Sequence, residues 1–407
     1  MKLSGTGARP PEKTEQDRIA ETVLRLTAFS LWHNGQPPDA DEAVFEEMKR
    51  QAVVVLPLDF LGEIQMPDSL RGVWRNVAVQ KVSFFYRCLD FQSRLPLTVP
   101  YAVLKGTSAA RYYPRPEYRI MGDIDLMTRR EDMNQACRDL MAAGWREVTG
   151  EQMEASGRHR AFVFSGITVE MHERFAYQRD PEAAEWLDDQ ITAAIGPDHT
   201  LPDLLNGLTL LEHLNHHMES GIGLRQILDW MMFAHRCLDG RGWQEFRPLA
   251  ERLGLVTLAK VCTRMCEIEL GFPEHEWCAD TDTELCRQLT DYVLECGNFG
   301  SKRERQSMIG EQFLSNARSL RGALVFLQRR GMMNWGMARR HPVLRPFAWA
   351  YQAVRYLRKG LSRNRAFGWL QDEYVLSRTR ASLYEALGVT REGEIRTLYR
   401  DGTYRKG

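Results

Sequence analysis

The residues best suited to chemistry lie in the segment Met121-Gly122-Asp123-Ile124-Asp125-Leu126, where two carboxylates alternate with apolar residues. Successive side chains of an extended strand point to opposite faces, so we expect Asp123 and Asp125 on one face, about 7 Å apart at the backbone. Ile124 and Leu126 are then expected to face the core. Two like charges this close raise each other's pKa unless a cation lies between them, and a divalent ion is the usual cation. The spacing therefore predicts a metal site.

A third carboxylate follows in a predicted hairpin. Two β-rich runs, 161–164 and 167–172, surround a Ser-Gly turn, and Glu170 lies late in the second run. If the hairpin pairs beside the aspartate strand, Glu170 joins the two aspartates, and three carboxylates can hold two metal ions about 4 Å apart. We expect Mg²⁺, with Mn²⁺ as the alternative, and we expect His172 on the same face as Glu170.

The segment before the aspartates predicts a phosphate-binding turn. An apolar run over 99–104 is followed by Lys105-Gly106-Thr107-Ser108, which has the pattern of a strand, a glycine turn and a capped helix start. Backbone N–H groups at a helix start bind phosphate, and hydroxyls and a lysine assist them. We therefore expect Lys105, Gly106, Thr107 and Ser108 to hold the phosphates of a nucleoside triphosphate.

Three arginines, Arg111, Arg115 and Arg119, lie between this turn and the aspartates. A guanidinium can clamp a triphosphate or shield carboxylates, whereas solvation at the surface is the structural alternative. Of the three, Arg119 is the one that we expect to bind the nucleotide.

This order of features resembles the nucleotidyltransferase superfamily typified by DNA polymerase β, which has an apolar strand, a Gly-Ser helix start, an Asp-x-Asp strand and a later acidic residue. More narrowly, Leu104-Lys105-Gly106, Arg119-x-x-Gly122-Asp123-Ile124-Asp125-Leu126 and Val169-Glu170-Met171-His172-Glu173-Arg174 look like the uncharacterised nucleotidyltransferase family. The resemblance covers roughly residues 85–235 and includes Leu210 to Trp230. Two departures are the Gly-Thr-Ser order and the long stretch from Gly106 to Asp123.

The resemblance implies transfer of a nucleoside monophosphate from a triphosphate to an acceptor hydroxyl or phosphate. Asp123 and Asp125 would bridge the metal ions, and Glu170 would bind the catalytic one. The acceptor suggested is a sugar, a lipid-linked sugar or a modified peptide, as in surface-polysaccharide and peptide modification, while nucleic-acid ends and protein side chains stay open. The alternative function is a scaffold that binds nucleotide within a biosynthetic complex and has no catalytic activity.

Four further residues have both a structural and a functional interpretation. His213, His216 and His217 have the i, i+3, i+4 spacing of metal ligands, yet packing is favoured, with one of them reaching the nucleotide as the second interpretation. Asp229 lies in an apolar helix, where a carboxylate needs a partner such as Arg225. A role of Asp229 as general base toward the acceptor is the minor interpretation.

The composition narrows the class of protein. Lys and Arg together number 54, as do Asp and Glu, so no global field indicates a nucleic-acid partner. The eight cysteines are scattered, and Cys262, Cys266 and Cys278 are expected to be reduced and packed rather than to form a zinc site. No signal peptide or transmembrane run is recognisable, which predicts a cytoplasmic protein.

The order of the expected helices and strands predicts an α+β fold. A small mixed β-sheet forms its nucleotidyltransferase core and positions these residues, and helical regions flank the core on the N-terminal and C-terminal sides. Helices are expected over Glu15–Trp32, Asp41–Val55 and Ser69–Leu95, then Arg130–Ala143, and again from Pro202 to about Gly297. The predicted regions are 14–96 (helical), 97–200 (catalytic core), 201–300 (helical) and 301–407 (basic and aromatic).

The last region has an unusual composition. Residues 301–370 contain fifteen Lys or Arg against two acidic residues, interleaved with aromatic side chains. Such a mixture suits a segment that binds a membrane surface, which would make the protein peripheral to the inner membrane face, or a segment that forms a nucleic-acid groove. The structural alternative is a basic helical cover packed on the core. Pro342 and Pro346 predict an extended loop, followed by an amphipathic helix from Phe347 to Leu361 that places Arg355, Arg358 and Lys359 near its end. A hairpin is expected within 394–406.

Overall fold

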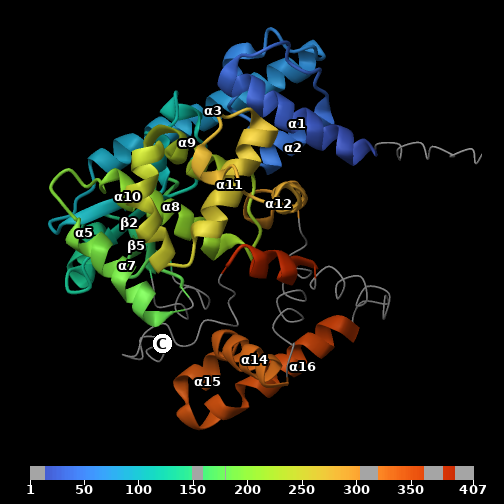
Figure 1. The fold of residues 1–407 in the computed structure, drawn as a ribbon. Helices are drawn as coiled ribbons and strands as arrows, with labels where there is room; N and C mark the ends of the chain where they lie inside the picture. The colour runs from blue at the N-terminus through green and yellow to red at the C-terminus, as the bar shows by residue number, and fades with distance from the viewer. Residues whose placement is uncertain (1–13, 149–158, 179, 303–319, 362–378, 390–407) are drawn as a thin grey trace, which may run out of the picture.

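A five-stranded mixed sheet surrounded by helices forms the centre of the chain (Figure 1). The computed structural model describes residues 14–148, 159–178, 180–302, 320–361 and 379–389. This arrangement confirms the predicted α+β class and its mixed sheet.

The sheet has the strand order β1-β2-β5-β4-β3. Its strands are β1 (Tyr101–Leu104), β2 (Ile124–Thr128), β3 (Arg146–Glu147), β4 (His159–Phe164) and β5 (Ile167–His172). β2 and β5 are parallel, and the other neighbours are antiparallel. The predicted hairpin, β4 and β5 joined at Ser165-Gly166, therefore pairs beside the aspartate strand as expected.

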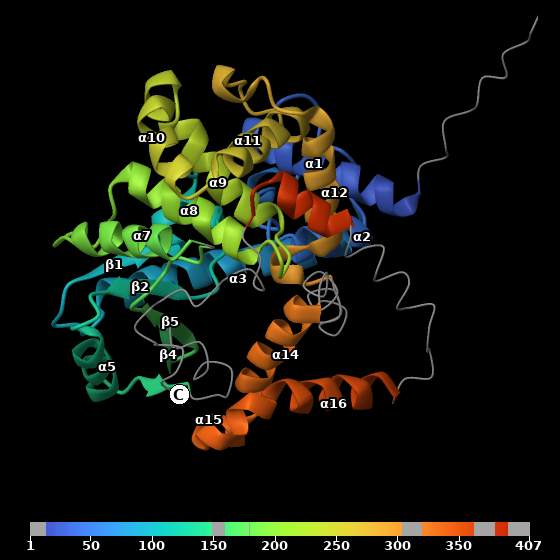
Figure 2. The same cartoon turned by 60° about the horizontal axis from the view of Figure 1, so that its bottom comes forward.

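The alternation of apolar and polar residues assigns the two faces of the sheet. One face packs against α3 (Asp68–Ser93) and α5 (Met133–Ala142). The strand residues of this core are Tyr101, Val103, Ile124, Leu126, Phe162, Ile167, Val169 and Met171. Successive strand residues point to opposite faces, so Asp125 points away from α5, toward the face contacted by α7 (Pro181–Ala193). In Figure 2, α7 and α8 lie above β1 and β2, and α5 lies below them.

The helices before the sheet follow the sequence closely. α1 (Glu15–Trp32) begins at a capping box formed by Thr14 and Asp17, and α2 (Glu42–Arg50) begins where the Asp41 side chain accepts from the Val44 N–H. Such caps satisfy N–H groups that have no partner within the helix. A 3₁₀ turn (Leu58–Phe60) separates α2 from α3. The three predicted helices are confirmed, although α2 ends earlier than expected.

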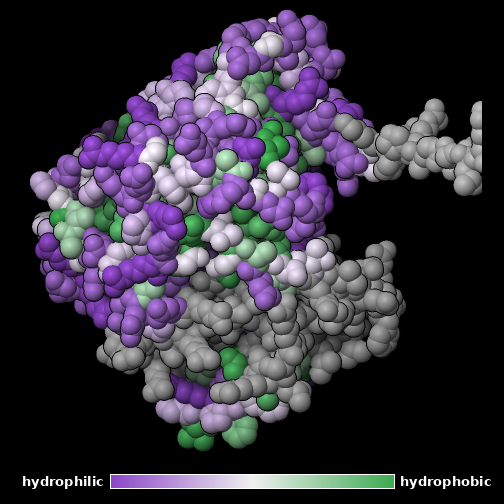
Figure 3. Space-filling view, viewed as in Figure 1, coloured by the Kyte–Doolittle hydropathy of each residue, from purple (hydrophilic) through white to green (hydrophobic). Residues whose placement is uncertain are grey.

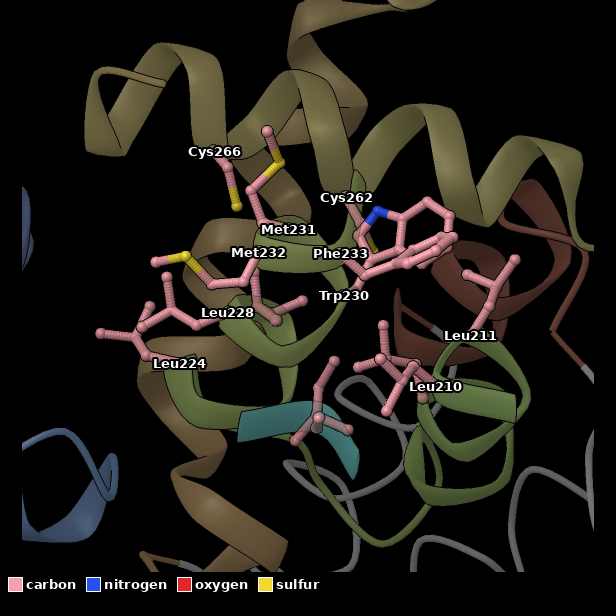
Figure 4. Close-up of a cluster of buried hydrophobic side chains, with 14 of the residues drawn as sticks. Leu210, Leu211, Leu224, Leu228, Trp230, Met231, Met232, Phe233, Cys262 and Cys266 are labelled. Carbon is pink, nitrogen blue, oxygen red and sulfur yellow. The ribbon is translucent and has the colours of Figure 1, made fainter. Parts of the chain in front are cut away.

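A second group of helices covers the polar face of the sheet. It contains α8 (Asp203–His217), α9 (Leu224–Cys237), α10 (Gly240–Arg252), α11 (Val256–Leu270) and α12 (Thr283–Cys296). Figure 4 shows apolar side chains of α8, α9 and α11 packed together, among them Leu210, Trp230 and Cys266. A Cβ at Gly207 would lie 2.0 Å from the Phe233 ring, so α8 and α9 approach too closely for any larger residue. Residues 379–386 are helical and add Leu383 and Tyr384 to this core.

The C-terminal helices form a separate group, below the rest in Figures 1 and 2. They are α14 (Leu320–Asn334), α15 (Gly336–Arg340) and α16 (Ala348–Leu361), and α14 packs against α16. The predicted amphipathic helix is confirmed as α16. The predicted extended loop is wrong, because Pro342–Phe347 is a 3₁₀ helix with a proline in its first turn, where the ring's fixed φ is tolerated. The Lys359 side chain and the predicted hairpin lie outside the described residues.

The surface of this C-terminal group carries exposed apolar residues. Val343 is 80% exposed and Phe347 is 58% exposed, and Figure 3 shows apolar surface at the lower end of the group. Among the residues that the structure describes, no helix is long and apolar enough to cross a membrane. The boundaries of the four predicted regions stay a prediction.

Candidate functional site

The centre of the candidate site is a pair of carboxylates on adjacent strands. The β2 and β5 register places Asp125 directly opposite Glu170, and His172 follows two residues along on β5. His172 Nε2 lies 3.0 Å from Asp125 Oδ1 and 3.6 Å from Glu170 Oε2. Ligand atoms of these three residues lie within 4.8 Å of one another, as the first coordination shell of one ion requires.

Lys105 supplies a cation to this pair of strands. Its Nζ lies 2.6 Å from Asp125 Oδ1, and both side chains are largely buried. Burial would raise the pKa of Asp125, but the Lys105 charge and the hydrogen bond with His172 hold that pKa below its usual value. Asp125 is therefore ionised at neutral pH.

Glu170 has the opposite shift. Burial, followed by the charges of Asp125 and Asp123, raises the pKa of Glu170 to about 7, with Lys105 opposing the rise. His159 Nε2 on β4 also approaches Glu170 Oε2, at 3.9 Å. Near pH 7 the site thus holds a proton that an arriving divalent ion would displace.

Asp123 lies one residue before β2 and is half-buried. The charge of Asp125, together with burial, raises the pKa of Asp123, while Lys105, Arg225 and Arg119 lower it. Asp123 therefore belongs to the same electrostatic site as Asp125 and Glu170. Among described residues, however, the compact ligand group consists of Asp125, Glu170 and His172.

The predicted phosphate-binding turn begins directly after β1. Lys105 has φ 46° and Gly106 has φ +38°, so the chain reverses sharply into the short helix α4 (Gly106–Ala110). A Cβ at Gly106 would lie 3.1 Å from Met121 Cε, which favours glycine there. Thr107 Oγ1 donates to Gln92 Oε1 at 2.6 Å, and Ser108 Oγ donates to Asn206 Oδ1 at 2.7 Å. Both hydroxyls thus have protein partners in this state.

Arg119 forms a buried ion pair with Asp229. Its Nε donates to Asp229 Oδ1 at 2.9 Å and its Nη2 to Oδ2 at 2.7 Å, and the Tyr113 hydroxyl donates to the same carboxylate at 2.9 Å. The sequence suggested Arg225 as the partner of Asp229, and this was wrong. The three donors satisfy Asp229, as a buried carboxylate requires, and the nucleotide-binding role of Arg119 stays a prediction.

Two of the α8 histidines, His213 and His217, are acted on by the charge of Lys105. Burial, assisted by the charges of Lys105 and Arg225, lowers the pKa of His217 to about 3. The pKa of His213 is lowered well below its usual value, mainly by burial. None of the three histidines is in the metal group found among the described residues, which favours the packing interpretation.

The cysteines match the packing prediction. All eight are free thiols, and seven of them are buried. Burial raises the pKa of Cys262, which keeps this thiol protonated and unsuited to bind zinc.

Two residues that approach the site were missed at the level of sequence. His159 is paired with His172 across β4 and β5, and the hairpin register could have identified it. Arg225 was considered only as a partner of Asp229, and its position beside the Ile120 carbonyl has no local sequence signal.

Comparison with known proteins gives one finding. A family model described as "Uncharacterised nucleotidyltransferase" matches residues 65–271, a span that contains the whole sheet, the phosphate-binding turn and α8 to α11. No curated protein and no solved structure matches the chain.

Proposed function

Because the chain belongs to the uncharacterised nucleotidyltransferase family, its activity is nucleotidyl transfer from a nucleoside triphosphate, and we propose a metal-dependent reaction at Asp125 and Glu170. In this reaction a nucleoside monophosphate moves to an acceptor hydroxyl or phosphate and pyrophosphate is released. The observation that carries the proposal is the register that places Asp125 opposite Glu170, with the Lys105 ammonium 2.6 Å from Asp125.

The residues present fit a divalent cation. Two carboxylates and an imidazole offer ligand atoms within 4.8 Å of one another, and oxygen ligands suit Mg²⁺ while the imidazole also suits Mn²⁺. Asp123 would extend the carboxylate set so that two ions are held. When bound, such ions stabilise the charge that develops on the transferring phosphoryl group and lower the pKa of the acceptor.

The remaining residues position the triphosphate in this proposal. Lys105 neutralises phosphate charge, and the backbone N–H groups of Gly106, Thr107 and Ser108 contact the phosphates. Arg119 stays a predicted nucleotide contact, and its ion pair with Asp229 also positions the segment that leads to Asp123. Rate enhancement then comes mainly from positioning and from charge neutralisation.

The assignment is tested with purified protein. We expect pyrophosphate release to require both an NTP and Mg²⁺ or Mn²⁺, and Asp125→Asn to abolish it. Each α-labelled NTP is incubated with a lysate, and the labelled product is identified. A sugar, lipid-linked sugar or peptide product is expected, whereas a labelled nucleic-acid end would assign a different acceptor.

A scaffold without catalytic activity is the competing function. It predicts nucleotide binding that ignores the divalent ion and gives no pyrophosphate with any acceptor. Retention of Asp123, Asp125, Glu170 and Lys105 around one site favours the enzyme.

We further propose that a cytoplasmic, membrane-peripheral location is mediated by the 3₁₀ helix Pro342–Phe347 and by α16. Val343, Phe347 and Trp349 are 80%, 58% and 41% exposed there, and Arg340 and Arg358 are exposed nearby. Exposed rings insert at an anionic lipid surface while cations pair with its phosphates. A lipid-linked acceptor would be reached from such a surface.

A further inference from the structure

Arg225, on α9, is a buried cation that lacks the partners a buried cation needs. Its side chain is 7% exposed, its Nη1 donates to the Ile120 carbonyl at 3.2 Å, and its Nε has no hydrogen-bond partner. No ion pair to Arg225 occurs within the part of the chain that the structure describes. The nearest candidate, Asp229, is taken by both arms of the Arg119 guanidinium.

An unpaired buried charge is costly, so a folded protein normally pairs or neutralises it. Burial, followed by the charge of Arg119, lowers the pKa of Arg225, and the more weakly acting charges of Asp229 and Asp123 oppose this shift without forming an ion pair with it. A guanidinium nevertheless stays protonated in proteins, and its remaining donors are arranged for a planar or multidentate anion. The missing partner is therefore expected to be an anionic ligand.

The ring of Phe299 covers this guanidinium. Arg225 Cζ lies 5.0 Å from the centroid of the Phe299 ring, and the centroid of the His217 ring lies 4.8 Å from the same Phe299 centroid. Phe299 is 43% exposed and has φ 52°, a left-handed conformation that is strained for a residue with a side chain. Strain of this kind persists only where the surroundings impose it, and it is concentrated at ligand sites.

The turn that carries Phe299 is held against α9 by glycines. A Cβ at Gly223 would lie 2.5 Å from the Asn298 nitrogen, and a Cβ at Gly221 would lie 2.8 Å from Gly300 Cα. Ser301 Oγ also donates to the Arg50 carbonyl at 3.0 Å. These close contacts on both sides of Phe299 constrain the backbone that carries its ring.

Arg225 also lies close to the candidate site. Its hydrogen-bond acceptor, Ile120, precedes Asp123 by three residues. The charges of Arg225 and Lys105 both act on Asp123, and both act on His217. The two cations therefore share one electrostatic neighbourhood with the carboxylates.

We propose that Arg225 binds a phosphate of the incoming nucleoside triphosphate, as a second cation beside Lys105, and that Phe299 positions its guanidinium. This inference rests on the proposed function. Phe299 lies beyond residues 65–271, so the segment that follows the family match would contribute to the nucleotide site. Arg119, the arginine expected from the sequence, is instead committed to Asp229.

The test uses inorganic tripolyphosphate and ATP, each with Mg²⁺, in calorimetric titrations of the full chain. We expect Arg225→Gln to weaken binding of both ligands about 10- to 100-fold, the range for a charged hydrogen-bond pair. Arg225→Lys keeps the charge without the fork and should recover part of this loss. Arg236→Gln, an exposed arginine on the same helix, is the matched control and should bind as the wild type does.

Phe299→Gly separates binding from folding. Glycine relieves the strained φ, so the unfolding temperature should be unchanged or higher, while tripolyphosphate binding weakens about 3- to 10-fold. Wild-type binding by Arg225→Gln, or by Phe299→Gly, would overturn the inference while leaving the proposed function intact. If the wild type binds neither ligand, the proposed function fails with it. If Arg225→Gln does not fold, the Phe299→Gly and Arg225→Lys affinities decide.

Discussion

Asp125 on β2 and Glu170 on β5 lie directly opposite each other in a parallel strand pair, although they are 45 positions apart in the sequence. Residues that are register partners point to the same face of the sheet, and parallel strands need no hairpin turn to join them. The pair is therefore fixed by the sheet, and its chemistry can be tested by changes that leave the backbone as it is.

Asp125→Asn should remove both metal binding and activity. The amide keeps the shape of the side chain but loses the charge, so we expect Mn²⁺ affinity to fall and pyrophosphate release to drop about 10³-fold or more. Mn²⁺ binding is followed by electron paramagnetic resonance, and release by a coupled assay. The exposed Asp189 on α7, changed to Asn, is the control and should behave as the wild type. Equal activity in Asp125→Asn would remove the assignment.

The pH dependence of stability should identify Glu170. Its pKa is raised from 4.5 to about 7, so the folded chain holds this proton more tightly than the unfolded chain. The resulting stabilisation is fully present below pH 4.5 and is lost as the pH rises through 7. This contribution of Glu170 lowers the free energy of unfolding of metal-free protein across the window, measured in urea with EDTA, whereas the lowered pKa values of His213 and His217 make an opposite contribution below pH 6.5.

Glu170→Gln should remove the Glu170 contribution, because glutamine does not titrate, so the free energy of unfolding of the wild type minus that of the variant should fall as the pH rises from 4.5 through 7. The lowered pKa of Asp125 acts only at more acid pH and does not mask the result. The same pH slope in the variant and the wild type would show that Glu170 titrates as an ordinary carboxylate.

The Arg119–Asp229 pair should be a large contributor to stability when only one partner is removed. Asp229→Asn leaves a buried guanidinium without its counter-ion, and we expect the free energy of unfolding to fall by about 3–5 kcal/mol. Changing both residues to Met and Leu should cost less than the sum of the single changes. Arg115→Gln breaks an exposed pair with Asp59 and should cost less than about 1 kcal/mol. Urea unfolding measures these three variants and the two single changes, Arg119→Met and Asp229→Leu, that the comparison needs.

Binding to lipid should depend on charge and on the exposed ring. We expect the full chain to sediment with anionic vesicles at low salt and to be released at high salt. Neutralising Arg340 and Arg358 should weaken binding about 30-fold, since each cation near the leaflet contributes about 1 kcal/mol. Phe347→Ser should weaken it at either salt concentration. Absence of sedimentation at low salt would reject the membrane proposal.

The sequence was sufficient for the sheet and for its carboxylates, because these depend on short-range patterns. Alternation around Asp125, the Ser-Gly turn and the later Glu170 predicted three strands, whereas their order in the sheet comes from the structure. Likewise, apolar residues at helical spacing predicted the helix Glu15–Trp32 with the bounds observed for α1.

Contacts between distant segments could not be predicted in this way. Arg119 meets Asp229 across 110 residues, and the Ser108 hydroxyl meets Asn206 across 98 residues. Either arginine near Asp229 satisfies the rule that a buried carboxylate needs a cation. Only the packing of α9 on the segment before β2 decides that Arg119, and not Arg225, pairs with Asp229.

The contact between Lys105 and Asp125 links metal binding and nucleotide binding thermodynamically in the proposed reaction. In the proposed reaction Asp125 would hold the cation, and the Lys105 ammonium, which lies 2.6 Å from Asp125 Oδ1 in this structure, would then be available to the phosphates. Each ligand then raises the affinity for the other by the same factor, as linkage requires. Free metal and free nucleotide should each bind weakly, and the chain should be selective for their complex.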